Sequence, residues 1–220
     1  DGEGGVFMEK SYTKIYTTGT TVPLKIRPGH FATNHAHINY YIDVTTLKAR
    51  TKEAEEVAQA LVGMYLYDTV IDTIVCMEGT EVIGAFLAEE LAKGGFLSTN
   101  AHKSIYVISP EFNNNSQIIF RDNLIPMIRD KHVMILMASV TTGRTLNKAV
   151  ESIQYYGGIL QGASAIFSAM DSLDGVPIKS VFGKKDLPDY TYSDYRDCPL
   201  CKAGKKIDAL VNTFGYSPMG

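Results

Sequence analysis

The stretch HVMILMASVTTGRTLNKAVESI, from His132 to Ile153, decides the fold of this 220-residue chain. Its first part, His132–Met137, contains an unbroken run of apolar residues after His132 and has the length of a buried strand. A polar loop with one glycine follows, and Thr145–Tyr156 then has the apolar spacing of a helix that ends at the pair Gly157-Gly158. A strand that feeds a helix through a tight loop is the repeating unit of a parallel α/β sheet.

Strand and helix patterns alternate on both sides of this stretch, from about residue 38 to about residue 170. Further strands are expected at Ile38–Val44, Asp72–Met77, Ser104–Ser109, Gly158–Met170 and Val176–Gly183. Further helices are expected at Thr51–Tyr67, with Thr51 as its cap, and between Glu78 and the pair Gly94-Gly95. The alternation predicts an α/β fold with a central parallel sheet flanked by helices.

Composition and charge exclude several classes of protein. Hydrophobic residues make up 45% and charged residues 20% of the chain, as in ordinary globular domains, and the formal net charge is −3. A chain without a basic excess is not expected to bind nucleic acid, whereas a small phosphorylated ligand needs only a local site. No apolar run approaches the ~18 residues of a membrane span, so no membrane partner is expected.

The chain is expected to be cytoplasmic and to form a single domain. Its first residues, DGEGGVFMEK, lack the apolar core of a signal peptide, and its three cysteines are a sparse, odd set that fits a reducing compartment. Residues 1–10 are expected to be disordered or to derive from a cloning vector, with Met8 as the native start. Residues 11–220 are expected to form the domain.

The loop VTTGRT has the features of a phosphate site. It follows a strand and opens a helix, where free backbone N–H groups and the helix dipole favour an anion. Thr141, Thr142 and Thr145 add hydroxyl donors, and Gly143 lets the backbone approach a ligand closely. Arg144 either adds a cation beside the phosphate or points to solvent. A strand-to-helix turn capped by a threonine would have the same residues, and spacing alone does not separate the two interpretations.

Four segments resemble the type I phosphoribosyltransferases, in the same order along the chain. HVMILMASVTTGRTL resembles the family motif that binds 5-phosphoribosyl 1-diphosphate (PRPP). The other three resemble the orotate phosphoribosyltransferase branch: HFATNHAHINYYIDV (30–44) its N-terminal motif, CMEGTEVIGAFLAEEL (76–91) its diphosphate-binding loop and helix, and DCPLCKAG (197–204) a Cys-Pro-Leu-Cys-Lys segment. The matched residues of the diphosphate loop are Glu78, Gly79 and Thr80.

This resemblance implies a fold, a reaction and an assembly. The fold is a parallel sheet with a small hood over the base site, here contributed by about residues 11–50 and the C-terminal tail. The reaction transfers phosphoribosyl from magnesium-bound PRPP to orotate through an oxocarbenium-like transition state, which the protein assists mainly by positioning and charge stabilisation. Mg²⁺ would arrive with PRPP. The assembly is a homodimer, to which the tyrosine-rich segment Tyr190–Tyr195 would add interface area.

Two elements depart from the family pattern. The two ribose-binding acids of the PRPP motif fall at Met137 and Ala138, which offer no carboxylate. The catalytic loop, which carries lysines and a histidine in the family, corresponds to Val107–Phe120, an Asn-rich segment expected to be mobile whose only charge is Glu111. The nearest cations only flank that segment, at Lys103 and Arg121. The catalytic residues are therefore unassigned, and we expect binding of PRPP or a nucleoside monophosphate with poor or no transfer.

Other interpretations of the same residues stay open. The fold without transferase activity would serve as a nucleotide-sensing or regulatory module, or as a structural protein with a vestigial phosphate loop. Glu78 is either a magnesium ligand or an acid at a helix N-terminus. Tyr40 and Tyr41 alternate along a strand, so at most one of them faces a base.

No protein-bound metal is expected. His35 and His37 would share a strand face near His30, but spacing fixes no further ligand beside them, which favours a polar pair in the hood or on the surface. Cys198 and Cys201 form one knuckle of two ligands, whereas zinc generally takes four. Zinc would then require two chains that pool their thiolates, and a packed irregular tail is the favoured alternative.

Overall fold

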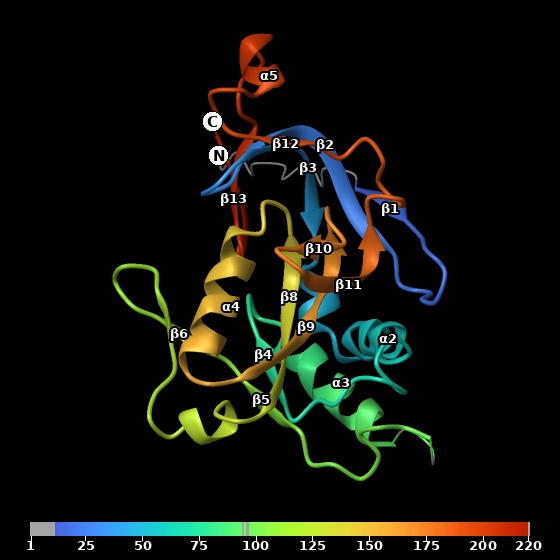
Figure 1. Ribbon diagram of the computed structural model, residues 1–220. Helices are drawn as coiled ribbons and strands as arrows, with labels where there is room; N and C mark the ends of the chain where they lie inside the picture. The colour runs from blue at the N-terminus through green and yellow to red at the C-terminus, as the bar shows by residue number, and fades with distance from the viewer. Residues whose placement is uncertain (1–11, 94, 96, 220) are drawn as a thin grey trace, which may run out of the picture.

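The computed structural model describes residues 12–93, 95 and 97–219, so the expectation for residues 1–10 lies outside the described part. The central sheet has the strand order β10-β11-β9-β8-β4-β5 (Figure 1). These strands are β4 (Thr73–Cys76), β5 (Tyr106–Ile108), β8 (His132–Val140), β9 (Ile159–Ser168), β10 (Ser172–Leu173) and β11 (Val176–Gly183). Neighbouring strands are parallel except for β10 and β11.

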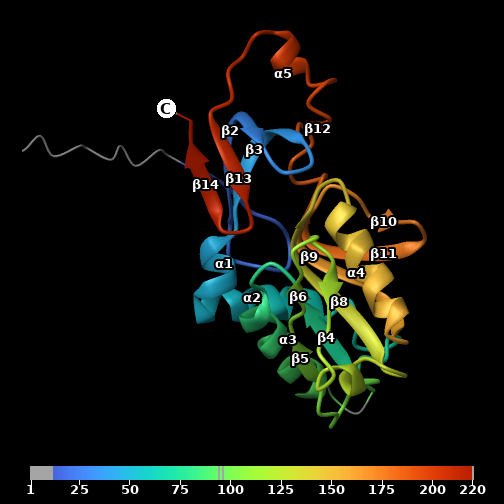
Figure 2. The same ribbon diagram turned by 90° about the vertical axis from the view of Figure 1, so that its left-hand side faces the viewer.

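Helices cover both faces of this sheet (Figure 2): α2 (Thr51–Val62) and α3 (Glu81–Lys93) lie on one face, and α4 (Arg144–Tyr155) on the other. The strand β8 sends alternate side chains to the two faces. Leu136 packs into the core with α2 and α3, whereas Ile135 packs into the core beneath α4. A strand buried on both faces must be apolar throughout, which explains its sequence. The expected α/β fold with a central parallel sheet is confirmed.

A second sheet, called the hood below, brings the two ends of the chain together. Its strand order is β12-β3-β2-β13-β14, and β1 also pairs with β2. These strands are β1 (Thr13–Ile15), β2 (Leu24–Ala32), β3 (His37–Asp43), β12 (Tyr192–Ser193), β13 (Ala209–Asn212) and β14 (Gly215–Pro218). The sequence patterns indicated β3 but not β2, because the pairing register shifts between Pro28 and Phe31 and interrupts the two-residue period.

Several segments differ from their predicted form. The helix α2 begins at Thr51, but α1 (Thr45–Ala49) directly precedes it and Arg50 is its N-cap, so Thr51 does not cap it. The segment 107–120, in which no strand was expected after Ser109, contains an antiparallel hairpin of β6 (Glu111–Phe112) with β7 (Ile118–Ile119). Two short helices were not expected: a 3₁₀ turn at Ile125–Met127 and α5 at Pro199–Lys202. Among the described helices, none has the length and apolar character to cross a membrane.

The direction of the strand order reverses between β4 and β8. From β4 the chain moves to β5 at the sheet edge, then returns to β8 on the other side of β4 and continues outward through β9 and β11. At such a reversal a crevice opens outside the carboxyl ends of the two strands, and α/β proteins bind their ligands there. The hood lies beyond this end of the sheet (Figure 1).

Candidate functional site

A cavity of about 370 Å³ occupies the crevice between the carboxyl ends of β4 and β8 and the hood. The β8–α4 loop forms one side of it. The opposite side comes from β3, the turn before β3 and the β13–β14 turn. The charged and aromatic lining residues are His35, Tyr41, Lys48, Glu78, Arg144, Tyr190 and Phe214.

The five residues of the predicted phosphate loop, Thr141–Thr145, all line this cavity. Gly143 is the N-cap of α4 with a left-handed φ of 78°, and the first intrahelical bond runs from Asn147 N–H to Gly143 O at 2.8 Å. The backbone N–H groups ahead of Asn147 therefore have no acceptor within the helix, and they lie at its positive end. Arg144 is exposed at the start of this turn. The loop can thus receive an anion from the cavity.

The threonines of the loop differ in their partners. Thr141 Oγ1 lies 2.9 Å from the hydroxyl of Tyr190, whose pKa is raised to about 12 by burial. Thr142 Oγ1 accepts a 3.4 Å bond from the backbone N–H of Arg144. Thr141 therefore anchors the loop to the protein, and a bound phosphate would meet Thr142 and Thr145 first.

Glu78 is the acidic residue of the cavity wall. It follows β4 with a left-handed φ of 59°, and its Oε2 accepts bonds from the backbone N–H groups of Ala138 at 3.0 Å and Ser139 at 3.3 Å. The carboxylate thus faces the end of β8, and the interpretation of Glu78 as an acid at the N-terminus of α3 is wrong. Burial raises the pKa of Glu78, although the two N–H donors and the nearby Lys48 act in the opposite direction.

The other two residues of the predicted diphosphate loop are not among the described residues that line the cavity. Gly79 is exposed with a φ of 78°. Thr80 is fully buried, and its hydroxyl donates to the carbonyl groups of Met77 at 2.8 Å and Leu136 at 3.1 Å. The geometry gives Thr80 the role of tying β4 to β8, so that only Glu78 of the three reaches the cavity.

Lys48 is a lining residue that the sequence patterns did not indicate. Its Nζ donates to the backbone carbonyl of Glu78 at 2.8 Å and to that of Thr213 at 3.2 Å. Lys48 therefore joins the loop after β4 to the β13–β14 turn of the hood. Its partners lie 30 and 165 residues away along the chain, so no local motif marks it.

Met137 and Ala138 differ in what they present to the cavity. The Met137 side chain is 1% exposed and packs into the core beneath α4. Ala138 is 5% exposed, and its N–H is taken by Glu78. The Glu78 carboxylate, from the loop after β4, thus lies beside the position at which the PRPP motif has its second acid.

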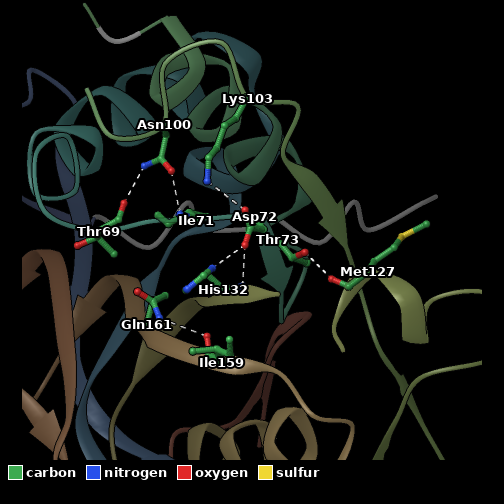
Figure 3. A network of polar contacts seen from close by, with 10 residues as sticks. All are labelled: Thr69, Ile71, Asp72, Thr73, Asn100, Lys103, Met127, His132, Ile159 and Gln161. Carbon is green, nitrogen blue, oxygen red and sulfur yellow. Dashed lines mark hydrogen bonds and ion pairs between the residues drawn. The ribbon is translucent and has the colours of Figure 1, made fainter. Parts of the chain in front are cut away.

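Lys103 and Arg121, the cations that flank the segment 107–120, both bind carboxylates outside the cavity. Arg121 donates from Nε and Nη2 to Glu111 Oε2 at 2.9 and 2.7 Å, which closes the β6–β7 hairpin. Lys103 donates to Asp72 Oδ1 at 3.1 Å, at the amino ends of β4 and β8 (Figure 3). Neither cation lines the cavity, and nor does any residue of 107–120, a segment that the structure describes throughout.

The aromatic side chains of the hood are divided between core and cavity. Tyr41 is 5% exposed and packs at 5.2 Å from the Tyr216 ring, while its edge lines the cavity. Tyr40 packs against the core without lining the cavity. Phe214, at the β13–β14 turn, is 94% exposed on the cavity rim. A planar base entering from the hood side would meet Tyr41 and Phe214.

The three N-terminal histidines separate in space. His35 lines the cavity, where burial and the nearby cations Arg144 and Lys148 lower its pKa. His30 and His37 lie instead on the far side of the hood with Cys198 and Cys201. The expectation that His35 and His37 form a pair is wrong, because His35 lies in the turn before β3 and only His37 is on the strand.

No protein-family profile and no curated protein sequence matches this chain. Solved structures do match its fold. A phosphoribosyltransferase from Corynebacterium diphtheriae superposes with a TM-score of 0.53 at 14% identity, covering 74% of this chain and 90% of that one. UMP synthase from Leishmania donovani gives 0.53 at 18% identity, covering 74% of this chain and 34% of that one.

A third match is orotate phosphoribosyltransferase from Mycobacterium tuberculosis H37Rv, in a complex with Fe(III) dicitrate. It gives a TM-score of 0.50 at 15% identity and covers 74% of this chain and 92% of that one. At these identities the likeness concerns the fold. The chain therefore has the type I phosphoribosyltransferase fold that the motifs implied.

Proposed function

We propose that the cavity binds a 5-phosphoribosyl ligand, PRPP or a nucleoside monophosphate, and that phosphoribosyl transfer to an orotate-type base is slow or absent. The observation that carries this proposal is the position of Thr141–Thr145. This loop places the positive end of α4 in a 370 Å³ cavity at the strand reversal of the sheet.

The polarity of the cavity supports one orientation of the ligand. A 5′-phosphate would lie against the backbone of Thr142–Thr145, with Arg144 beside it. The ribose would lie above the ends of β4 and β8, next to Glu78. The base would then reach the hood, where Tyr41 and Phe214 offer aromatic faces.

Glu78 fits the magnesium ion that PRPP carries. Mg²⁺ is commonly held by one or two carboxylates together with substrate phosphates, and Glu78 is the one carboxylate among the described lining residues. Its Oε2 is occupied by two N–H donors, so Oε1 is the atom offered to an ion. When bound, the ion would neutralise diphosphate charge, a task for which the segment 107–120 supplies no cation.

Slow transfer follows from the two departures from the family. The ribose would meet one carboxylate, that of Glu78, in place of the two acids of the PRPP motif. The leaving diphosphate would meet no side-chain cation from the β6–β7 hairpin. If each loss removes ~3 kcal/mol of transition-state stabilisation, the reaction slows by about 10⁴-fold. Phosphate binding depends on the backbone of the β8–α4 loop and is spared.

A nucleotide-sensing role is the second candidate. The favouring observation is Lys48, which links the loop of Glu78 to the hood turn at Thr213. A ligand that displaces Lys48 from either carbonyl would change how the hood is held. Such a module needs binding but no turnover.

The assembly and the compartment belong to the same proposal. A homodimer would use exposed aromatic side chains of the tail, of which Tyr192 is 42% and Tyr195 58% exposed. Tyr190 is not available for an interface, because it is buried against Phe167. We propose a cytoplasmic protein without nucleic-acid or membrane partners.

The binding proposal is tested by calorimetry with PRPP, ribose 5-phosphate and orotidylate, each with and without Mg²⁺. Arg144→Ala should weaken binding of all three phosphates about 5- to 10-fold, since one charge-assisted contact is removed. Lys52→Ala, at an exposed position of α2 that does not line the cavity, is the matched control for loss of positive charge. Gly143 is a poor probe, because an added Cβ would lie 3.0 Å from Leu173 and disturb the loop itself.

Two results would contradict the proposal. Absence of binding by all three ligands would leave the phosphate loop vestigial. A turnover number of about 1–10³ s⁻¹ for orotidylate formation would show that other residues replace the missing groups.

A further inference from the structure

A second cluster of chemistry-bearing side chains lies in the hood, away from the cavity. His30 comes from β2 and His37 from β3, whereas Cys198 is the N-cap of α5 and Cys201 lies within it. One nitrogen or sulfur atom of each lies within 4.8 Å of the corresponding atoms of the other three. We propose that these four side chains bind one zinc ion, within a single chain.

Four of the six distances among these atoms are close to those of a tetrahedral site, and the other two are within 4.8 Å. A zinc ion with Zn–S bonds of ~2.3 Å and Zn–N bonds of ~2.0–2.1 Å has ligand atoms about 3.3–3.8 Å apart. His30 Nε2 lies 3.1 Å from His37 Nδ1, and Cys201 Sγ lies 3.3 Å from His37 Nδ1. His30 Nε2 lies 3.5 Å from Cys198 Sγ and 3.7 Å from Cys201 Sγ. The four atoms are therefore close enough together to be ligands of one ion.

The surroundings of His30 orient it as a ligand. Its Nδ1–H donates to the backbone carbonyl of Lys205 at 2.8 Å, which leaves the lone pair of Nε2 directed into the cluster. Such a bond at the second ring nitrogen is how metal-binding histidines are usually held. His30 is fully buried and Cys198 is 2% exposed, whereas Cys201 is exposed, so the site sits at the edge of the hood with one open flank.

The donor set selects the type of ion. Two thiolates and two imidazoles are soft and borderline ligands, which suit zinc, whereas Mg²⁺ and Ca²⁺ require oxygen. Two thiolates also neutralise the charge of Zn²⁺, so the ion adds no net charge to the partly buried site. Four protein ligands leave no open position, which is the pattern of a structural site rather than a catalytic one.

The position of the cluster gives the ion a structural task. The ion would tie the segment around α5 to β2 and β3. Figures 1 and 2 show α5 on the side of these strands that is away from the central sheet. The strands β13 and β14 follow directly, and their turn, residues 212–215, lines the cavity. Zinc would thus hold the last part of the chain in the place from which it covers the cavity.

The test uses the untagged full chain, purified under reducing conditions, because a polyhistidine tag binds zinc itself. Elemental analysis should find one zinc per chain, and removal by a strong chelator should lower the thermal midpoint until zinc is returned. The double variant Cys198→Ser with Cys201→Ser should lose the zinc. Cys76→Ala and His35→Gln, which remove a thiol and an imidazole outside the cluster, should keep it.

A second variant guards against simple misfolding of the double mutant. Cys201→His replaces an exposed ligand by another ligand, so the metal should be retained. Reconstitution with Co²⁺ should show the visible bands of a tetrahedral ion in both proteins, and the thiolate charge-transfer band should be about half as intense in the variant.

Three outcomes would overturn the zinc site. The first is that the unmodified apoprotein takes up no zinc or cobalt from an excess. The second is that the double variant keeps a full equivalent of zinc. The third is a Cys198–Cys201 disulfide, found by mass spectrometry in protein made in a reducing cytoplasm. None of these measurements involves PRPP, so the zinc site and the phosphoribosyl site stand or fall separately. A confirmed site would replace the sequence-based expectation that the chain holds no metal.

Discussion

Two carboxylates link β4 to β8, Asp72 at the amino end of the strand pair and Glu78 at the carboxyl end. Their hydrogen-bonding partners differ in kind. At the amino end, Asp72 Oδ2 accepts from His132 N–H at 2.9 Å and His132 Nδ1–H at 2.7 Å, while Oδ1 accepts from Lys103 (Figure 3). At the carboxyl end, Glu78 Oε2 accepts from two backbone N–H groups, and Lys48 binds the Glu78 carbonyl instead of its carboxylate.

The different partners move the two pKa values in different directions. Partial burial raises the pKa of Asp72, but the bonds from His132 and Lys103 outweigh it and lower the pKa to about 2. Burial dominates at Glu78 and raises its pKa. The amino end of the strand pair is therefore built for stability. The carboxyl end keeps a poorly compensated acid beside the cavity, which is typical of functional positions.

The largest expected effect comes from placing a carboxyl at position 137, where the PRPP motif has its first acid. Met137→Asp would place a carboxyl in the core beneath α4, where Met137 is 1% exposed. The free energy of unfolding should fall by about 3 kcal/mol or more, because a buried carboxylate without a partner is costly. Met137→Leu nearly conserves volume and should cost less than about 1.5 kcal/mol. Urea unfolding measures both, and an unchanged midpoint for Met137→Asp would show that the new side chain reaches the cavity.

A smaller effect is expected at the amino end. Asp72→Asn should lower the free energy of unfolding at pH 7 by about 1–2 kcal/mol, after allowance for screening of a partly exposed group. The folded pKa is depressed, so the stabilisation is complete above pH ~4 and disappears as the pH falls toward 2. Unfolding curves across that range measure it, with the exposed Asp122→Asn as the control for charge. Equal effects at pH 7 and pH 2 would argue against an electrostatic cause.

The smallest effect on stability is expected at Glu78. A raised folded pKa means that stability declines as the pH rises from ~4 through that pKa. Glu78→Gln keeps an oxygen acceptor for Ala138 and Ser139 and removes the charge. The variant should therefore match the unmodified chain or exceed it by up to about 1 kcal/mol at pH 7. Denaturant unfolding at pH 4 and pH 7 checks this.

The variant Glu78→Gln also tests whether this carboxylate takes part in magnesium-dependent binding. Glu78→Gln should abolish the gain in PRPP affinity that Mg²⁺ provides, while ribose 5-phosphate binds as before. Calorimetry with both ligands is the measurement. Magnesium dependence that survives in Glu78→Gln would place the ion on the ligand alone. Asp72→Asn should leave both affinities unchanged, because it lies at the opposite end of β4.

Local sequence determined the features that depend on neighbouring residues. The apolar run of β8, the turn at Gly143 and the start of α4 occupy one continuous stretch, so strand, loop and helix could be predicted together, along with the phosphate site that we propose there. The parallel sheet followed from the alternation of strands and helices. The matched solved structures share this fold.

Tertiary structure alone decided which distant residues meet. The Glu78 carboxylate, in the loop after β4, accepts from the N–H of Ala138, 60 residues away, and Lys48 donates to a hood turn 165 residues away. His30 lies beside Cys198, which is 168 residues away in the sequence, because β13 pairs with β2 and so returns the C-terminal segment to the first strands. A short stretch of sequence contains only one of the two residues that make each contact. The geometry of the other side depends on the packing of both sheets, and that packing is a property of the whole chain.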